Sequence, residues 1–397
     1  MHHRPTHEPL APATRRTVVE ALRTTNAGDM TRRQFVALAT ALGLSMSTAA
    51  TLLAACGGKQ GGGASPTPMD TTLPSQLNLW NWAGYISPKV LKDFEKEYGV
   101  KCVVKPIRSL EASVRELGSQ PSAYDVFFSA DTYITPLREA GLLRPLDMSL
   151  IPNFANVTQQ AFRSPPFDPG SDGDKYTVPY MFGTVGIAVR IDKVADPGES
   201  WDMLFDPRNR GQVGMIQLMR EMFSAAPFSL GYSPNTTSQS ELDEATDALI
   251  KQKRLYAQNI DMTAPATVII NGNGFTECWD GDAIYAMNEL GLKRVRYVLP
   301  SEGYIVWSDA LCIPKKAASP YAAHLFLNFI LDPANAAACA NFLGYQPVVE
   351  AADPLIKSMM QRSLRPTEDV LARGVFIEDI GDFTAQYEAA FKKVQKA

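Results

Sequence analysis

Short apolar strands alternate with amphipathic helices along this chain, and this alternation constrains the fold more than any other feature. A helix pattern over 87–98 ends at Gly99 and leads into a strand pattern over 101–106. A second strand, 126–129, is followed by a helix from about 132 to 141. Strands that alternate with helices in this way are typical of a parallel sheet covered on both faces. The pattern therefore predicts an α/β fold.

A second series of the same signals follows later in the chain. From Leu77 onward the chain has roughly 320 residues, which is enough for two domains of ordinary size. Two packed lobes are therefore predicted. The remaining elements are expected as helices at 109–117, 240–253 and 282–290, and as strands at 212–216 and 275–279.

The stretch that begins at Leu77 turns a strand into an aromatic loop and then into a helix. Ser87 followed by Pro88 marks the start of that helix, so Trp82 and Tyr85 remain in the loop. Ligands of open α/β sheets gather where strands end at their carboxyl side, so the two rings suggest a wall for a small molecule. The alternative is that both rings are ordinary core residues, and this stretch alone leaves the two open.

Residues 1–55 have the features of a twin-arginine lipoprotein signal, so they are excluded from the fold. The sequence Thr-Arg-Arg-Gln-Phe-Val at 31–36 is followed by an uncharged apolar run that ends in Leu-Ala-Ala-Cys at 53–56. Such an ending is typical of lipoproteins that are cleaved before the cysteine and acylated on it, here at Cys56. Met30 is a candidate for the true translation start. The apolar run has roughly 20 residues, so an uncleaved membrane helix is the alternative.

Residues 56–76 are rich in glycine, serine and proline and are expected to form a flexible tether. The protein is thus expected to be exported and anchored through its acyl chains to the extracytoplasmic face of a membrane, in the periplasm or cell envelope. The formal net charge is −4, and the chain contains no basic run. A nucleic-acid partner is therefore not expected.

The nucleophilic residues form no catalytic or metal-binding motif. Cys102, Cys278, Cys312 and Cys339 make no Cys-x-x-Cys pair and have no neighbouring histidine, so no metal site is expected. Free thiols are expected, and a disulfide stays open because the protein is exported. His324 is expected as a surface or core residue rather than a base. Without a nucleophile elbow, phosphate-binding loop or dinucleotide fingerprint, neither an enzyme nor a cofactor is expected.

Several short motifs occur in an order and spacing that carry a resemblance to a known family. They are Leu-Trp-Asn-Trp at 79–82 with Tyr85; Ala-Tyr-Asp-Val at 123–126 with Asp131; 176–180 with Gly183; Gly-Tyr-Ser-Pro-Asn-Thr-Thr at 231–237; Trp-Asp-Gly at 279–281; Glu-Gly at 302–303; Trp307 with Asp309; and Gly-Tyr at 344–345. The chain resembles the spermidine/putrescine-binding proteins of polyamine importers, members of the bacterial extracellular solute-binding family.

The resemblance implies a two-lobed periplasmic-binding-protein fold of type II, with the ligand in the cleft between the lobes and closure about a hinge. Chain crossings are expected near 182–184, 307–308 and 353. Lobe one would take residues 77–182 and 308–353, and lobe two would take residues 183–307 and 354–397.

The resemblance also implies a binding site for a polyamine, a flexible apolar rod that carries separated ammonium groups. Aromatic faces would pack along the methylenes and attract the cations, while carboxylates would hold the charged nitrogens. The family positions that would line the cleft are Trp82, Tyr85, Trp279, Trp307 and Tyr345 for the aromatics and Asp131, Glu221 and Asp309 for the acids. Asp309 is favoured because it stands between two expected strands, Ile305–Trp307 and Ala310–Ile313. An acid usually has a surface role instead.

The chain departs from spermidine-binding relatives at two of these family positions. Leu218 replaces an expected aspartate and Ile377 an expected glutamine, although Glu378 is adjacent. The ligand could then be shorter or less charged than spermidine, or another amine-bearing solute; a sensor or an enzyme on the same fold is the remaining alternative. Expected partners are a cationic small molecule, the permease of an ABC importer and the membrane through the lipid anchor, with the protein acting as a monomer.

Overall fold

The computed structural model describes residues 69–397 except 108–115, 118, 121, 169, 171–173, 195–197, 257–264 and 359–364. The signal, Cys56, most of the tether and most of the predicted helix 109–117 lie outside the described residues. The strands are β1 (Gln76–Asn81), β2 (Lys101–Pro106), β3 (Val126–Ala130), β4 (Thr177–Arg190), β5 (Val213–Gly214), β6 (Phe275–Trp279), β7 (Val295–Val298), β8 (Tyr304–Cys312), β9 (Gln346–Pro347) and β10 (Gly374–Val375).

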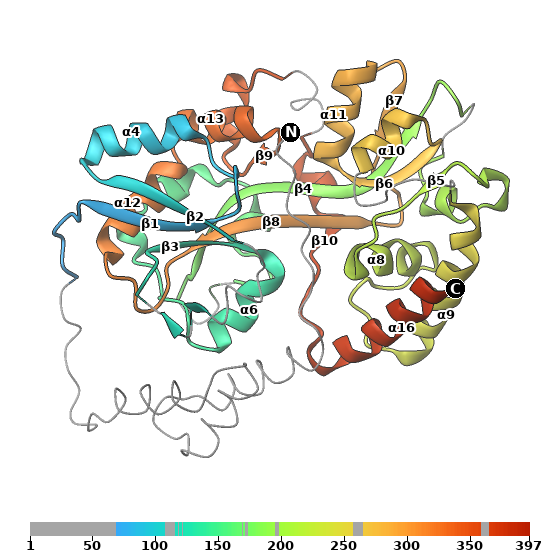
Figure 1. Cartoon of the computed structure of the whole chain (residues 1–397), viewed down its shortest axis with the longest axis horizontal. Coiled ribbons are helices and arrows are strands. Elements are labelled where there is room, and N and C mark those ends of the chain that lie inside the picture. Colours follow the sequence, from blue (N-terminus) through green and yellow to red (C-terminus); the bar gives the residue numbers. More distant parts are fainter. Residues whose placement is uncertain are drawn as a thin grey trace, which may run out of the picture.

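The described helices cover both faces of the strands (Figure 1). They are α4 (Pro88–Tyr98), α6 (Asp131–Glu139), α7 (Gln160–Arg163), α8 (Met219–Ser229), α9 (Gln239–Gln252), α10 (Pro265–Asn271), α11 (Asp280–Leu290), α12 (Pro320–Ile330), α13 (Pro333–Leu343), α15 (Glu368–Leu371) and α16 (Thr384–Lys396). Within the part of the chain that the structure describes, no helix combines the length and apolar character needed to cross a membrane.

Local sequence signals place several of these elements within a residue or two. Helix α4 begins at Pro88 after Ser87 and ends before Gly99, whose φ of 69° is a left-handed conformation that glycine adopts without strain. The strands predicted at 101–106 and 275–279 are confirmed. The strand predicted at 212–216 is shorter, since β5 contains only Val213 and Gly214.

The prediction of a parallel sheet is wrong, because the sheet is mixed. Its strand order is β2-β1-β3-β8-β4-β6-β5, with β10 beside β8 and both β7 and β9 beside β4. β1 pairs in parallel with β2 and β3, whereas β3–β8, β8–β4 and β4–β6 are antiparallel. Strand–helix alternation implies parallel pairing only when each helix joins neighbouring strands. Here β8 enters the sheet between β3 and β4, although it follows them by more than a hundred residues.

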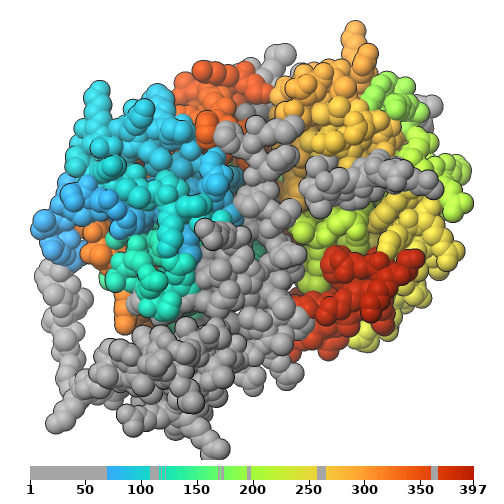
Figure 2. Space-filling view, in the orientation of Figure 1, coloured from blue at the N-terminus to red at the C-terminus, as the bar shows by residue number. Residues whose placement is uncertain are grey.

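Two long strands, β4 and β8, connect the two halves of the molecule (Figure 1). β1, β2, β3, α4, α6 and α12 lie in one half, and β5, β6, β7, α8, α9, α10 and α11 lie in the other. The same separation is visible on the surface, with the blue and teal residues on one side and the yellow and red residues on the other (Figure 2). The positions of two predicted crossings, near 182–184 and 307–308, lie where these strands pair, Phe182 with Ser308 and Gly183 with Trp307. The residue boundaries of the lobes stay a prediction.

Strand β8 is continuous, so the predicted break on either side of Asp309 is wrong. All its residues from Tyr304 to Cys312 are buried. The backbone at Asp309 pairs with Ala130 of β3, and a buried acid inside a strand is tolerated when its oxygens find donors. The acidic residue therefore interrupts the apolar pattern of the sequence without interrupting the ladder of backbone hydrogen bonds.

The cysteines and the histidine have structural environments. All four described cysteines are free thiols, and no metal-binding group of His, Cys, Asp and Glu occurs among the described residues. His324 is buried: its Nε2 accepts from Asp147 N at 2.9 Å, and its Nδ1 contacts the Pro320 carbonyl at 2.7 Å. Burial lowers the pKa of His324. Of the two roles expected for His324, surface or core, its burial in α12 fits the core one.

Candidate ligand-binding site

The loop after β1 is fixed by Asn81, a buried polar residue at the end of the strand. Asn81 Oδ1 accepts from Trp82 N at 2.8 Å, and its Nδ2 donates to the Tyr85 carbonyl at 3.1 Å. Tyr85 N donates in turn to the Trp82 carbonyl at 3.1 Å, and Gly84 between them has a φ of 72°. The turn therefore sets the two rings edge to face, with centroids 5.3 Å apart.

The hydroxyl of Tyr85 reaches Asp309 across the sheet. Tyr85 Oη donates to Asp309 Oδ2 at 2.5 Å, and the Asp309 side chain is fully buried. Tyr180 on β4 supports this pair, because its Oη donates to the Tyr85 carbonyl at 3.3 Å and its ring packs against Tyr85 at 5.7 Å. Burial, with the Cys339 thiol close by, holds the pKa of Tyr180 well above its usual value. A phenol thus holds a carboxylate in a dry, aromatic environment.

The other aromatic residues continue from this pair toward the opposite half of the molecule. The Tyr345 ring lies 6.3 Å from that of Tyr85 and 5.3 Å from that of Trp307, edge to face in both cases. Two glycines make room for these rings. A Cβ on Gly281 would lie 2.5 Å from the Tyr345 ring, and one on Gly183 would lie 2.4 Å from Trp307 Cζ2. The Tyr345 and Trp307 rings therefore pack directly against the backbone of Gly281 and Gly183.

Asp131 joins the same region through the backbone of β8. It is the first residue of α6, where the positive end of the helix dipole favours an acid. Its Oδ1 accepts from Thr132 N at 2.8 Å, and its Oδ2 accepts from Ser308 N at 3.1 Å. The Ser308 bond places Asp131 beside Trp307 and Asp309.

The two remaining predicted residues lie on elements of the second half. Trp279 ends β6, where it pairs with Val185 of β4, two residues from the Gly183–Trp307 pair. Its side chain is buried, and its Nε1 has no hydrogen-bond partner among the described residues. Glu221 lies in the first turn of α8 and is partly exposed. The sheet register thus brings Trp279 toward Trp307, whereas Glu221 lies on a separate element, helix α8.

Two buried acids of this region were missed by reasoning from the sequence. Asp280 is buried, and its Oδ1 accepts from Gly281 N at 2.9 Å and would lie 2.4 Å from a Cβ on Gly183. Glu277, two residues before Trp279 on β6, is also buried. A lone acid inside an apolar strand was the available signal for Glu277.

A pocket of about 150 Å³ lies between α6 and the segment 376–379. Its lining includes Asp131, Arg138, Ile377 and Glu378, so both residues singled out near the C-terminus reach it. The segment is tied to the second half of the molecule, since Asn235 donates from Nδ2 to the Phe376 carbonyl at 2.8 Å.

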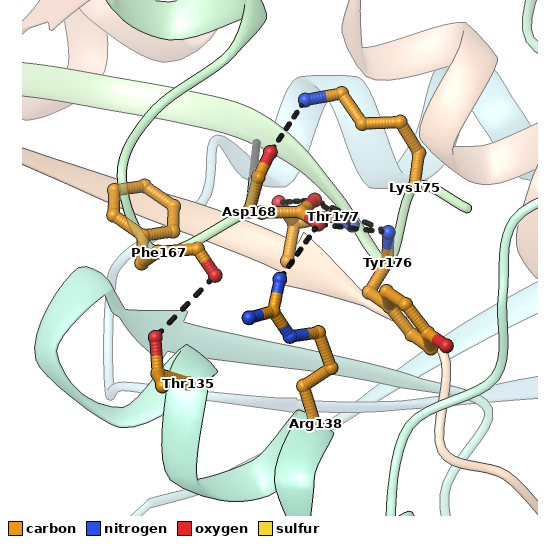
Figure 3. Close-up of polar contacts among 7 residues, drawn as sticks. All are labelled: Thr135, Arg138, Phe167, Asp168, Lys175, Tyr176 and Thr177. Carbon is orange, nitrogen blue, oxygen red and sulfur yellow. Dashed lines mark hydrogen bonds and ion pairs between the residues drawn. The ribbon is translucent and has the colours of Figure 1, made fainter. Parts of the chain in front are cut away.

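Phe167 lines this pocket, and the buried carboxylate of the next residue, Asp168, bonds to the start of β4 (Figure 3). Asp168 accepts from Thr177 N at 2.9 Å and from Thr177 Oγ1 at 2.7 Å, and Arg138 Nη1 lies 3.9 Å from its Oδ1. Thr135 Oγ1 donates to the Phe167 carbonyl at 3.4 Å. These contacts fasten α6 to the start of β4, so this side of the pocket is a fixed part of the first half.

Fold and site together define a class of protein. Two α/β halves joined by long strands, with aromatic rings and buried acids where the halves meet, are the architecture of a solute-binding protein. The sequence matches the family of bacterial extracellular solute-binding proteins over residues 89–363. The chain belongs to this family, and its fold is the two-lobed periplasmic-binding-protein fold that the resemblance implied.

Several relatives of this chain are named as binding proteins for the polyamines spermidine and putrescine. The spermidine/putrescine-binding periplasmic protein of Salmonella typhimurium is 32% identical over 326 residues, which cover 80% of this chain and 91% of that protein. The putrescine-binding periplasmic protein SpuD of Pseudomonas aeruginosa is 29% identical, covering 75% and 85%. A solved structure of the spermidine/putrescine transporter substrate-binding protein PotD from Streptococcus pneumoniae has a TM-score of 0.73 at 26% identity, covering 81% of this chain and 99% of that one.

Proposed function

We propose that this chain is a lipid-anchored extracytoplasmic binding protein that delivers a polyamine of the putrescine or spermidine type to the permease of an ABC importer. The observation that carries the proposal most is the fully buried carboxylate of Asp309, held by Tyr85 Oη at 2.5 Å next to the Trp307 and Tyr345 rings. The names of the Salmonella and Pseudomonas relatives support the ligand class.

The chemistry of these groups suits an alkyl ammonium. A buried carboxylate in an apolar environment favours a cation that can donate hydrogen bonds to it. Ring faces attract that cation by about 0.5–2 kcal/mol each and also pack against methylene groups. Asp131 and Asp309 are close to each other through Ser308, so negative charge is concentrated at one end of the ring cluster. The opposite end, near Glu221, would take the second ammonium.

Calorimetric titration with butane-1,4-diamine, spermidine and butane-1,4-diol tests this proposal. We expect the diamine to bind at least as tightly as spermidine, because Leu218 and Ile377 offer no polar contact to a third nitrogen. We expect the diol to bind at least about 30-fold more weakly, since a neutral hydroxyl forfeits the charged hydrogen bonds, worth about 2 kcal/mol or more. Tight diol binding would contradict the polyamine proposal; a preference for another amine would favour the second candidate, a different amine-bearing solute.

Anchoring is tested separately with Cys56→Ser. We expect the variant to fold normally but to leave the membrane fraction, because the proposed acyl chains are its anchor and a serine cannot be acylated at this site. Fractionation and immunoblotting measure this, with Cys102→Ser as the control that keeps the lipidation cysteine. A processed Cys56→Ser protein that stays in the membrane fraction would contradict lipid anchoring.

A further inference from the structure

Glu277 is a fully buried acid at the centre of β6 that the proposed site does not yet use. Its Oε2 accepts from Ile216 N at 3.0 Å, and its Oε1 has no hydrogen-bond partner among the described residues. Leaving a buried carboxyl oxygen unsatisfied is costly, so such a group calls for an explanation. Its neighbours on the same face of β6, Phe275 and Trp279, are both aromatic, so the acid interrupts an apolar surface.

The position of Glu277 connects it to the predicted cation site. Residues two apart on a strand share a face, so Glu277 lies on the face of β6 that carries Trp279. Glu277 accepts a hydrogen bond from the backbone of Ile216, and the chain runs from Ile216 directly into α8. The first turn of α8 contains Glu221. Cys278 points to the other face, into an apolar cluster with Ala283 of α11.

The charged and titratable groups around β6 leave Glu221 as the partner of Glu277. The charge of Glu221 raises the pKa of Glu277, and the charge of Glu277 raises that of Tyr256. The Tyr256 hydroxyl contacts Met215 Sδ at 3.6 Å. Asp280 and Asp282 of α11 act on Cys278, on the opposite face. Helix α10 and strand β5 contain no titratable residue, and Asp202 in the turn 201–204 is exposed. Arg190, at the end of the neighbouring strand β4, bonds to Asp192 and to the carbonyls of Ile269 and Ile270. Within the described part of the chain, no lysine or arginine is among the groups that act on Glu277.

We infer that Glu277 is a positioning residue for the cation site, which holds a proton behind Glu221 when the cleft is empty and releases it to solvent when an ammonium arrives. The step is a single ionisation: the carboxylic acid of Glu277 becomes a carboxylate, and the added negative charge is balanced by the ligand. The inference rests on the proposed function, since it needs a cation near Glu221.

The direction of the coupling follows from electrostatics. Burial, reinforced by the nearby Glu221, raises the pKa of Glu277 well above its usual value, so the empty protein keeps the neutral form of Glu277 to a higher pH than an exposed glutamic acid would. A cation beside Glu221 favours the ionised form of both acids. The ligand's own amines, like that of lysine, stay protonated near neutral pH. Binding should therefore release protons and tighten as the pH rises.

The same shift predicts the pH dependence of stability. A raised pKa in the folded protein means that the contribution of Glu277 is fully present below its unfolded pKa, near 4.5, and is lost as the pH rises through the folded pKa. Glu277→Gln matches the neutral acid in shape and cannot ionise. We therefore expect the free energy of unfolding of wild type to fall relative to that of the variant as the pH is raised above about 4.5.

Calorimetry with butane-1,4-diamine tests the inference, using wild type, Glu277→Gln and the exposed control Glu289→Gln. Titrations in phosphate and in Tris at one pH give the protons released, since the buffers differ in ionisation enthalpy. We expect wild type and Glu289→Gln to release up to one proton per ligand and to gain up to about tenfold in affinity per pH unit. Glu277→Gln should release markedly fewer protons and show a flatter pH profile.

The outcomes separate this inference from the function on which it rests. Wild-type protein that binds no diamine at any pH overturns the proposed function and this inference with it. Diamine binding with equal proton release in wild type and Glu277→Gln overturns the inference alone. A purely structural Glu277 would change stability in the variant without changing proton release.

Discussion

Asp309→Asn is expected to weaken binding of butane-1,4-diamine by about 2–5 kcal/mol, or roughly 30- to 4000-fold. The asparagine keeps the shape of the side chain, and its carbonyl oxygen can still accept from Tyr85 Oη, which now donates to Asp309 Oδ2 at 2.5 Å. The negative charge is removed, and an NH2 donor replaces one of the two acceptor oxygens. Because the site is buried, the ammonium would remain desolvated without its ionic partner, and the loss should appear directly in calorimetric titrations.

Trp279→Ala is the matched comparison for Asp309→Asn. It removes a buried ring from the end of β6 while leaving every predicted carboxylate in place. Binding should weaken through lost packing and cation–π attraction, about 0.5–2 kcal/mol, yet the preference for diamine over diol should persist. Asp309→Asn should instead reduce that preference. Equal diamine affinity in wild type and Asp309→Asn would mean that Asp309 does not hold the ligand as a cation.

Gly183→Ala is expected to lower both stability and affinity, because it adds a methyl group where β4 meets β8. The new Cβ would lie 2.4 Å from Trp307 Cζ2 and 2.4 Å from Asp280 Oδ1. Asp280 is held by Gly281 N at 2.9 Å, so we expect the Trp307 ring, which now packs against Tyr345, to be displaced. We expect about 1–3 kcal/mol less free energy of unfolding. We also expect about tenfold or greater loss of diamine affinity from the displaced ring.

Gly198→Ala is the control for this overpacking. A Cβ at Gly198 would meet nothing nearer than Met203 Cγ at 4.0 Å, an ordinary contact. Chemical denaturation and calorimetry of both variants measure the two effects together. A Gly183→Ala protein that unfolds and binds like the Gly198→Ala control would show that Trp307 can leave its present position without consequence for the site.

The elements that sequence reasoning placed well are those with local signals. Pro88 and Gly99 delimit α4 because a proline at the first turn and a left-handed glycine at the end are set by nearby atoms alone. Strand direction is different. β8 lies between β3 and β4 because of contacts between segments far apart in the chain, and no local pattern encodes that order.

The site shows the same division between local and long-range information. Aromatic residues and acids of the right chemistry could be named from motifs, but the pairing of Tyr85 with Asp309 joins residues 224 positions apart and depends on sheet register. The sequence pattern places Asp309 in a gap between two strands, since an acid rarely occupies a buried strand. The pattern gives Glu277 no binding role for the same reason. Buried acids contradict the usual pattern, and here they lie next to the predicted binding residues.

A crystal structure of the protein with butane-1,4-diamine tests the central claim most directly. The claim is that the rings and acids between the two halves hold an organic cation. We predict one nitrogen of the diamine within hydrogen-bonding distance of Asp309, with its methylene groups against the Trp307 and Tyr345 rings and its other nitrogen toward Glu221. A diamine bound elsewhere on the molecule, or a neutral or anionic solute occupying the space beside Asp309, would contradict the claim.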